Sequence, residues 1–367
     1  MNKILFIFLF SFLNHLSLIA QQADTTFYDE ERTLIREIFT LQNGVPHGDY
    51  TRYYLEEGLA ERGAFVSGKR QGLFVSYYPN TSDTLRTIYF EDGFRSGKAI
   101  TYHRNGNISQ EAHFEDDLLQ GEIKTYYESG KLETLTPVTD NNPHGRKESY
   151  YEQGGIRETV EFVHGVLDGE SIRHDEKGNK ISLSIYSDGK LSGTSLTFYP
   201  DGELESEVHY RDGLRHGSYV VYYPNQQIEE EGEYRQGRPH GTFSTYHSNG
   251  QVASVITYRQ GVAWGKSTTF YPSGKEETVT VYDKFGHPQM EEEFYESGQL
   301  RKTMSFINGL ESGKAIFYHE NGEISEVIPY DQGKISGIYQ SFDENGKIIR
   351  ERKFENGREL GMDADRK

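Results

Sequence analysis

The stretch "RDGLRHGSYVVYYP", from Arg211 to Pro224, contains two glycines four residues apart, Gly213 and Gly217. Such a pair could belong to a phosphate-binding loop, to a seam between membrane helices or to a β-turn. A phosphate loop needs a following Lys-Ser/Thr and a helix N-terminus, and a helix seam needs an apolar host helix. Neither surrounds this stretch, so the pair indicates a turn between strands, where glycine supplies positive φ.

The glycine pair recurs along the chain with a period of 24 residues, except for one step of 25 from Gly72 to Gly97. Gln289 interrupts the series, and thirteen units fit between Gly48 and Gly361. A fixed period of this length is typical of repeat proteins. The second glycine of each pair stands at Gly48, Gly72, Gly97, Gly121, Gly145, Gly169, Gly193, Gly217, Gly241, Gly265, Gly313, Gly337 and Gly361.

Each unit has the pattern of a β-hairpin. Residues 204–210 alternate between a buried and a solvated set, which is typical of a strand with one buried face. "YPDG" at residues 199–202 has the composition of a hairpin turn. Aromatic residues recur five and seventeen positions after the second glycine, as in Tyr222 and Tyr234, and we expect them to pack neighbouring hairpins together. The predicted fold is therefore all-β: an elongated, antiparallel single-sheet array of hairpins.

Composition and charge exclude several classes of function. The chain has a formal net charge of −18, which should repel the phosphate backbone of nucleic acids. It has no cysteine, which excludes disulfides, thiol nucleophiles and cysteine-based zinc sites. Hydrophobic residues make up 34% and glycines number 39, which favours turn-rich β-structure over one large core.

The N-terminus reads "MNKILFIFLFSFLNHLSLIAQQ" and is similar to a secretory signal peptide. Lys3 precedes an apolar run, and Ala20 precedes polar residues at the expected cleavage point. An uncleaved membrane anchor is the rival interpretation, but the run is short for a span. We therefore expect a signal peptide at 1–20, a capping half-repeat at 21–43, the repeat array at 44–361 and a polar tail at 362–367, with the mature protein exported to the periplasm, the outer envelope or the medium.

The repeat unit resembles the MORN repeat variant of bacterial proteins. Residues 189–213 ("GKLSGTSLTFYPDGELESEVHYRDG") and 237–261 ("GRPHGTFSTYHSNGQVASVITYRQG") carry the resemblance, which extends from about Gly44 to Gly361. It implies antiparallel hairpins in a row. Many proteins of this kind are labelled as antitoxins of the YwqK-type family of toxin–antitoxin systems. MORN repeats more generally are associated with protein–protein contact and, in some eukaryotic members, with membrane lipid.

Two sets of residues, histidines beside framework glycines and runs of glutamates, could form metal or catalytic sites, but each set also has a purely structural explanation. His47, His144, His216 and His240 each precede a framework glycine, but residues one repeat apart should lie about 9.6 Å from each other, too far to share a zinc ion. We therefore expect solvated turn histidines. The acidic runs at 228–234 and 290–296 should send alternate glutamates to opposite faces, so we predict solvated strand faces and no calcium or catalytic carboxylate site.

Two features depart from the repeat. Trp264 is the only tryptophan and lies in a variable position just before Gly265, which makes it the one candidate contact residue. At residues 285–289 ("FGHPQ") the framework glycines are lost, which fits a kink, a partner-specific feature or, as we favour, plain decay of the repeat. No catalytic, cofactor or metal residue stands out from the repeat, so we expect a protein that is not an enzyme and carries no cofactor.

The leading hypothesis is an exported, non-enzymatic scaffold that binds a protein or a cell-envelope component through an acidic, aromatic-bearing surface. It would bind no nucleic acid and would not span a membrane once the signal peptide is removed. A first alternative is an antitoxin-like protein that neutralises a partner toxin, although an export signal fits a cytoplasmic antitoxin poorly. A second is a hydrolase acting on polysaccharide, which would need a pocket of polar residues that departs from the repeat.

Overall fold

The computed structural model describes residues 22–56 and 58–360 and divides the chain into two compact units, one ending at Glu152 and one beginning at Gln153. The expected signal peptide, the polar tail and Gly361 lie outside the described residues. We call the two parts unit 1 and unit 2 and describe each by itself.

Unit 1 consists of consecutive antiparallel strands joined by tight turns. Its strands are β1 (Gln22–Phe27), β2 (Ile35–Gln42), β3 (Val45–Tyr53), β4 (Leu59–Val66), β5 (Lys69–Tyr77), β6 (Thr84–Glu91), β7 (Phe94–Tyr102), β8 (Ile108–Glu115), β9 (Leu118–Tyr126), β10 (Leu132–Thr139), β11 (Asn142–Pro143) and β12 (Gly145–Tyr150).

Unit 2 repeats the same arrangement. Its strands are β13 (Ile156–Val163), β14 (Val166–His174), β15 (Lys180–Ser187), β16 (Lys190–Leu191), β17 (Gly193–Phe198), β18 (Leu204–Arg211), β19 (Leu214–Tyr222), β20 (Ile228–Arg235), β21 (Arg238–Tyr246), β22 (Val252–Arg259), β23 (Val262–Ala263), β24 (Gly265–Phe270), β25 (Glu276–Tyr282), β26 (Pro288–Phe294), β27 (Leu300–Ile307), β28 (Leu310–Glu311), β29 (Gly313–Tyr318), β30 (Ile324–Asp331), β31 (Lys334–Ile335), β32 (Gly337–Phe342), β33 (Ile348–Glu355) and β34 (Arg358–Leu360).

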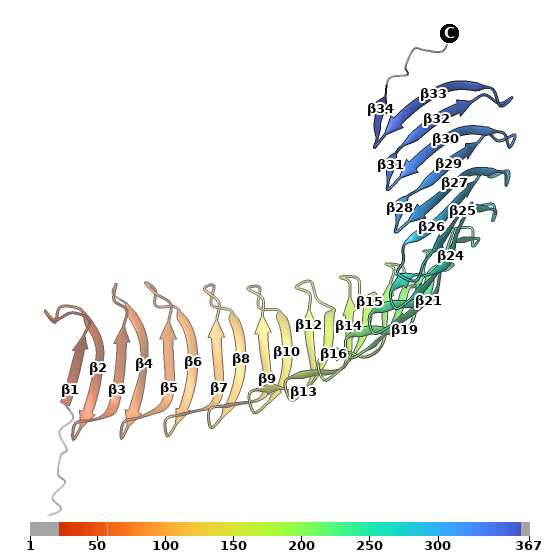
Figure 1. The fold of residues 1–367 in the computed structure, drawn as a ribbon. Helices are drawn as coiled ribbons and strands as arrows, with labels where there is room; N and C mark the ends of the chain where they lie inside the picture. Colours follow the sequence, from red (N-terminus) through yellow and green to blue (C-terminus); the bar gives the residue numbers. More distant parts are fainter. Residues whose placement is uncertain (1–21, 57, 361–367) are drawn as a thin grey trace, which may run out of the picture. The chain divides into compact units, whose positions relative to one another are not determined.

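The prediction of an all-β array of antiparallel hairpins is confirmed: within each unit the hairpins follow one another in chain order as an open sheet (Figure 1). Neighbouring strands pair residue by residue, as Gly241 to Tyr246 do with Tyr258 to Val252. In residues 22–56 and 58–360 there is no helix of sufficient length and apolarity to cross a membrane.

The two glycines of each pair have different roles. Gly213 follows Asp212 in a two-residue turn, with φ of 81° and 53°, the positive values that such hairpin turns require. Gly217 lies four residues on, inside β19, with φ of 104° beside an irregularity in the pairing with β18. The turn prediction is thus confirmed for the first glycine and wrong for the second, which occupies a β-bulge.

The strand register explains the spacing of seventeen between the second glycine and the aromatic residue. Gly217 pairs directly with Tyr234, and Gly241 pairs directly with Tyr258. An aromatic ring opposite a glycine can cover the backbone that the glycine leaves bare. The register therefore places each of these two bulge glycines opposite an aromatic residue of the next strand.

Unit 1 has the more deeply buried core. Tyr50, Phe74 and Phe90 are buried together, with Phe39 and Phe65 packed against them. The ring centroids of Phe74 and Phe90 lie 5.0 Å apart in an edge-to-face arrangement, a favoured geometry for aromatic pairs.

Unit 2 builds its main aromatic cluster in the same way. Phe243 is buried, and its ring centroid lies 5.4 Å from that of Tyr234 and 5.3 Å from that of Tyr258. In both units a glycine lies under the central phenylalanine. A Cβ atom on Gly63 would come within 2.6 Å of the Phe74 ring, and one on Gly232 within 2.5 Å of the Phe243 ring. These glycines are required by the closeness of the ring.

Candidate binding surface

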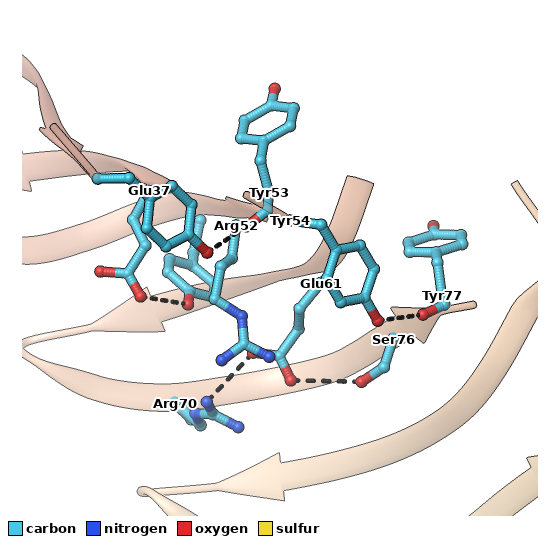
Figure 2. A network of polar contacts seen from close by, with 10 residues as sticks. Glu37, Arg52, Tyr53, Tyr54, Glu61, Arg70, Ser76 and Tyr77 are labelled. Carbon is cyan, nitrogen blue, oxygen red and sulfur yellow. Dashed lines mark hydrogen bonds and ion pairs between the residues drawn. The ribbon is translucent and has the colours of Figure 1, made fainter. Parts of the chain in front are cut away.

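A buried carboxylate organises a polar network beside the core of unit 1 (Figure 2). Glu61, on β4, is only 4% exposed. Its carboxylate lies 3.3 Å from the Arg70 guanidinium and 3.9 Å from that of Arg52, and it accepts a hydrogen bond of 3.4 Å from the Ser76 hydroxyl. The alternation of the strands brings these side chains from β3, β4 and β5 to one face, where two arginines compensate the buried charge.

This network is closed to ligands. The Arg70 guanidinium lies over the Phe74 ring, 4.6 Å from its centroid, and over the Phe90 ring at 5.1 Å. The space left between Glu61, Arg70 and these rings has a volume of about 20 Å³, room for one water molecule and no substrate. The charges of Glu61 and Arg70 therefore stabilise the packing of unit 1 and are not offered to a partner.

The Tyr50 phenol belongs to the same region and is a hydrogen-bond donor. Its hydroxyl donates to the Glu37 carboxylate at 3.1 Å. Burial and the nearby Glu37 carboxylate raise the pKa of Tyr50 to about 12, because both disfavour the phenolate. Tyr50 therefore stays protonated at neutral pH and cannot act as a base.

A second set of tyrosines, which the sequence analysis missed, links each repeat to the next. The Tyr54 hydroxyl donates to the backbone carbonyl of Tyr77 (Figure 2), and the Tyr223 hydroxyl donates to that of Tyr246, both at 2.7 Å. Equivalent hydrogen bonds are made by Tyr78, Tyr127, Tyr199, Tyr271 and Tyr295, and a ring nitrogen replaces the hydroxyl in His103, His247 and His319. The signal is a Tyr or His column six residues after the second glycine, next to the aromatic column used for the prediction.

The four histidines before framework glycines do not form a metal centre. The His47 ring accepts a hydrogen bond of 3.3 Å from the Ser67 backbone N–H. His144 lies in the same unit, whereas His216 and His240 belong to unit 2. Across the described part of the chain, no three histidine or acidic side chains are grouped so that they could hold a metal ion.

The glutamates of the 228–234 run point to different partners, as strand alternation predicts. Glu230 accepts a hydrogen bond of 3.1 Å from the Tyr219 hydroxyl, and Glu231 accepts one of 2.6 Å from the Tyr246 hydroxyl. Each carboxylate is thus occupied by a phenol from a neighbouring strand, and the two do not converge on a site.

The 290–296 run contains one convergent group. The Lys302 ammonium lies 2.8 Å from the Glu291 carboxylate and 2.9 Å from that of Glu293, two residues that share a strand face. Burial alone would lower the pKa of Lys302, but the hydrogen bonds to both glutamates outweigh it and raise the pKa. The Lys302 ammonium therefore compensates the negative charges of Glu291 and Glu293.

The departure at residues 285–289 is a change of turn. The Asp283 N–H donates to the His287 carbonyl, and the Asp283 carboxylate accepts the N–H groups of Phe285 and His287. Strands β25 and β26 still pair as a hairpin. A side-chain-capped turn here replaces the glycine pair, so the lost framework glycines do not interrupt the array in unit 2.

Trp264 lies beside the bulge between β23 and β24, where its backbone N–H donates to the Thr257 backbone carbonyl at 2.8 Å. Its side chain is 42% exposed. The Arg259 guanidinium lies over the indole, 5.6 Å from the ring centroid. The candidate contact residue is thus accessible and is paired with an arginine.

Exposed apolar side chains occupy one repeat position in both units, directly after the first framework position, which is a glycine in each case except Asp117 before Leu118. These side chains are 39% to 51% exposed. We call them the apolar column. Its members are Val45, Phe94 and Leu118 in unit 1, and Val166, Leu214, Val262 and Leu310 in unit 2.

Arginines form another column that the sequence analysis missed. Arg211, Arg235 and Arg259 are spaced by 24 residues, the repeat period, and all three are exposed. Three successive arginines at one repeat position in an acidic chain are the signal that could have identified this column.

Comparison with protein families identifies the repeat. The model of the MORN repeat variant matches eight segments of the chain, each of which covers most of one hairpin. The matched residues are 95–116, 119–139, 191–212, 215–236, 239–260, 290–308, 311–332 and 335–356. No curated protein matches the chain.

Solved structures are similar only at a low level. A crystal structure of TcdB2-TccC3-Cdc42 is 10% identical with a TM-score of 0.18, over 87% of this chain and 20% of that one. A structure of the Photorhabdus luminescens Tc holotoxin pore is 10% identical with a TM-score of 0.16, over 91% of this chain and 22% of that one. The chain thus spans about a fifth of the length of these structures. Such TM-scores establish nothing about its function.

Proposed function

This chain belongs to the proteins built from MORN repeat variants, and we propose that it is an exported, non-enzymatic scaffold that binds a protein or another component of the cell envelope. The binding surface is the edge of the sheet that carries the two-residue turns. The observation that carries the proposal is the apolar column.

Exposed apolar side chains are ordinary when they are scattered, but the apolar column repeats at one position in each unit. In unit 2, Leu214 and Val262 lie two repeats apart, and strand spacing places successive repeats about 9.6 Å from each other. Packing within the fold explains part of the apolar character at this position, since the Leu214 side chain lies against the turn at Gly237. The exposed remainder is available to a partner that is itself extended.

Charges at the same repeat position favour a partner with anionic groups. In unit 2 the positions between Val166, Leu214 and Val262 hold Lys190 and Arg238. A surface that alternates apolar and cationic side chains fits a partner that presents apolar and acidic groups in turn.

A binding role without catalysis agrees with the polar groups of both units. Glu61 is enclosed by two arginines, and Glu291 and Glu293 share Lys302. The tyrosines that link successive repeats, such as Tyr223, donate their hydroxyl groups to backbone carbonyls. General acid or base chemistry needs a group that can reach a substrate, and these groups are already occupied.

Export rests on the N-terminal sequence and has a direct test. Mass spectrometry of the protein recovered from the culture medium or the cell envelope should give a mature N-terminus at Gln21. Recovery of the intact N-terminus from the cytoplasm alone would contradict export.

Binding is tested by co-sedimentation of the purified mature chain with cell envelopes of the organism that makes it. The variant Leu214→Ser/Val262→Ser removes two members of the apolar column, and Ile349→Ser removes an exposed apolar side chain on β33 as the control. We expect the wild type and the control to sediment with the envelopes and the double variant to remain soluble. Equal sedimentation of all three would refute the assignment of the surface. Protease treatment of the envelopes then separates a protein partner from another component.

A further inference from the structure

A groove lined by cations opens between two successive turns of unit 2. Its volume is about 670 Å³, within the range of small-molecule sites. It is lined by Arg235, Gln236, Arg238, Pro239, His240, Arg259 and Gln260. The turn segments 235–241 and 259–265 contain no acidic residue, although the whole chain has a net charge of −18.

The arginines of this groove have no internal counter-charge. None of the ion pairs between described residues of unit 2 includes Arg235, Arg238 or Arg259. Glu233, an acidic residue on the adjoining strand, pairs with His240 in the strand register and does not line the groove. Two arginines close to turns of unit 1 show the opposite arrangement, since Arg70 binds Glu61 and Arg95 binds Asp117.

Folding does not explain the placement of two of these arginines. Arg235 and Arg238 face each other directly across the two-residue turn. Like charges at directly opposed positions destabilise a hairpin. A bound anion would convert this repulsion into attraction, because each guanidinium would then donate to the same ligand.

The groove also marks an interruption in the contacts between turns. The Gly213 N–H donates to the Leu191 carbonyl at 2.8 Å, and the Gly237 N–H donates to that of Arg215 at 2.9 Å. Within the described residues, the equivalent Gly261 N–H makes no such bond to Pro239. The turn at Gln260 is thus not tied to the preceding one, and the groove lies between these two segments.

From these observations we infer that the groove binds a phosphate ester. The guanidinium group is a planar fork of donors that binds phosphate oxygens in pairs, and three such forks line the groove. The amides of Gln236 and Gln260 add neutral donors at equivalent positions of the two turns. A phosphate monoester carries up to two charges at neutral pH, which three arginines can compensate, and the volume leaves room for the sugar or alcohol that bears it.

This inference goes beyond the proposed function and does not depend on it, since the groove could take a free phosphate ester or one displayed on the envelope. Trp264 provides the test, because it is the only tryptophan of the chain and lies under Arg259. Its emission can be followed while glucose 1-phosphate, inorganic phosphate or glucose is added. We expect a saturable change with the two phosphates and none with glucose.

Variants then locate the binding. Arg238→Gln should weaken the affinity for glucose 1-phosphate at least about tenfold, because a charge-assisted bidentate contact is lost. Arg238→Lys should give an intermediate loss, since it keeps the charge and loses the fork. Lys334→Gln is the matched control, with the same repeat position and the same change in charge, and should bind as the wild type does.

Two further measurements complete the experiment. Vesicles that contain phosphatidic acid distinguish the sources of phosphate: binding lost in Arg238→Gln indicates a membrane-borne ester, and binding of the soluble ester alone indicates a free one. Calorimetric titration detects binding that leaves the Trp264 emission unchanged. No saturable binding of either phosphate by both methods, or equal affinities of the wild type and Arg238→Gln, would overturn the inference.

Discussion

The aromatic clusters of the two units differ in whether the arginine that covers the rings is paired with a carboxylate. In unit 1 a glycine lies under Phe74, and Arg70 covers the rings of Phe74 and Phe90 while it binds the buried Glu61. In unit 2 a glycine lies under Phe243 in the same way.

The arginine that covers the cluster of unit 2 has no carboxylate partner. The Arg215 guanidinium lies over Tyr219 and Tyr234, 5.5 Å and 5.2 Å from the ring centroids, and donates to the Tyr234 hydroxyl at 3.3 Å. The same packing of an arginine on aromatic rings thus occurs with an ion pair in unit 1, between Arg70 and Glu61, and without one in unit 2, at Arg215. The comparison indicates that aromatic contacts hold both clusters together, and that the arginine over the rings is paired with a carboxylate only in unit 1.

The largest effect should come from removing the central rings. Phe74→Ala and Phe243→Ala should each lower the free energy of unfolding by about 3 to 5 kcal/mol, because a buried ring is replaced by a cavity. Urea unfolding followed by tyrosine fluorescence measures both. A loss under about 1 kcal/mol for either variant would show that the ring is peripheral and would break the parallel between the clusters.

The next effect separates the two clusters. Glu61→Gln should cost about 2 to 3 kcal/mol, because it removes the negative charge that two arginines share. Glu230→Gln occupies the equivalent place in unit 2 and should cost under about 1 kcal/mol, since the Tyr219 hydroxyl can still donate to the amide oxygen. If urea unfolding showed that both variants lose the same free energy of unfolding, this would contradict the proposed difference between an arginine-paired Glu61 and a tyrosine-bound Glu230.

A backbone substitution tests the repeat geometry that both units share. Gly217→Val should lower the free energy of unfolding by roughly 2 kcal/mol or more, because a β-branched residue is strained at a φ of 104° and its Cβ would lie 3.3 Å from that of His209. His216→Ala, at the neighbouring position, should cost under about 0.5 kcal/mol. Similar unfolding midpoints would mean that the bulge does not need glycine.

The smallest effect is confined to alkaline solution and should be alike in both units. Burial and nearby carboxylates raise the pKa of Tyr50 and of Tyr219 to about 12, from the usual value of 10.0. Because the folded-state pKa is raised, the stabilisation is complete below pH 10 and is lost as the pH rises toward 12. A pH titration followed by tyrosinate absorbance should show a group of phenols that ionise well above pH 10. The variant Tyr50→Phe should reduce the amplitude of this group by one phenol. Ionisation of every phenol near pH 10 would contradict the burial of these rings.

Much of the fold could be predicted from local patterns. The 24-residue period, the turn glycines and the period-two alternation lie within single hairpins, so the sequence displays them directly. The different role of Gly217 was missed, because a bulge depends on the register between two strands. Strand β1 was also missed, since it precedes the first complete repeat.

The polar contacts were harder to predict, because they join residues of different repeats. Glu61 meets arginines from both neighbouring strands, and few repeats hold a glutamate at that position. The groove of unit 2 depends on Arg235 and Arg259 being brought together by the stacking of turns. Trp264 was identified by its uniqueness, but its arginine partner could be found only from the structure.

The most direct test of the account compares one arginine from each unit in two assays. Arg70→Gln should lower the melting temperature by about 3 °C or more and leave the affinity for glucose 1-phosphate unchanged, because Arg70 compensates a buried charge. Arg238→Gln should leave the melting temperature unchanged or slightly higher, since it relieves the repulsion from Arg235, and should weaken phosphate-ester binding at least about tenfold. A lower melting temperature for Arg238→Gln with undiminished binding would contradict the account.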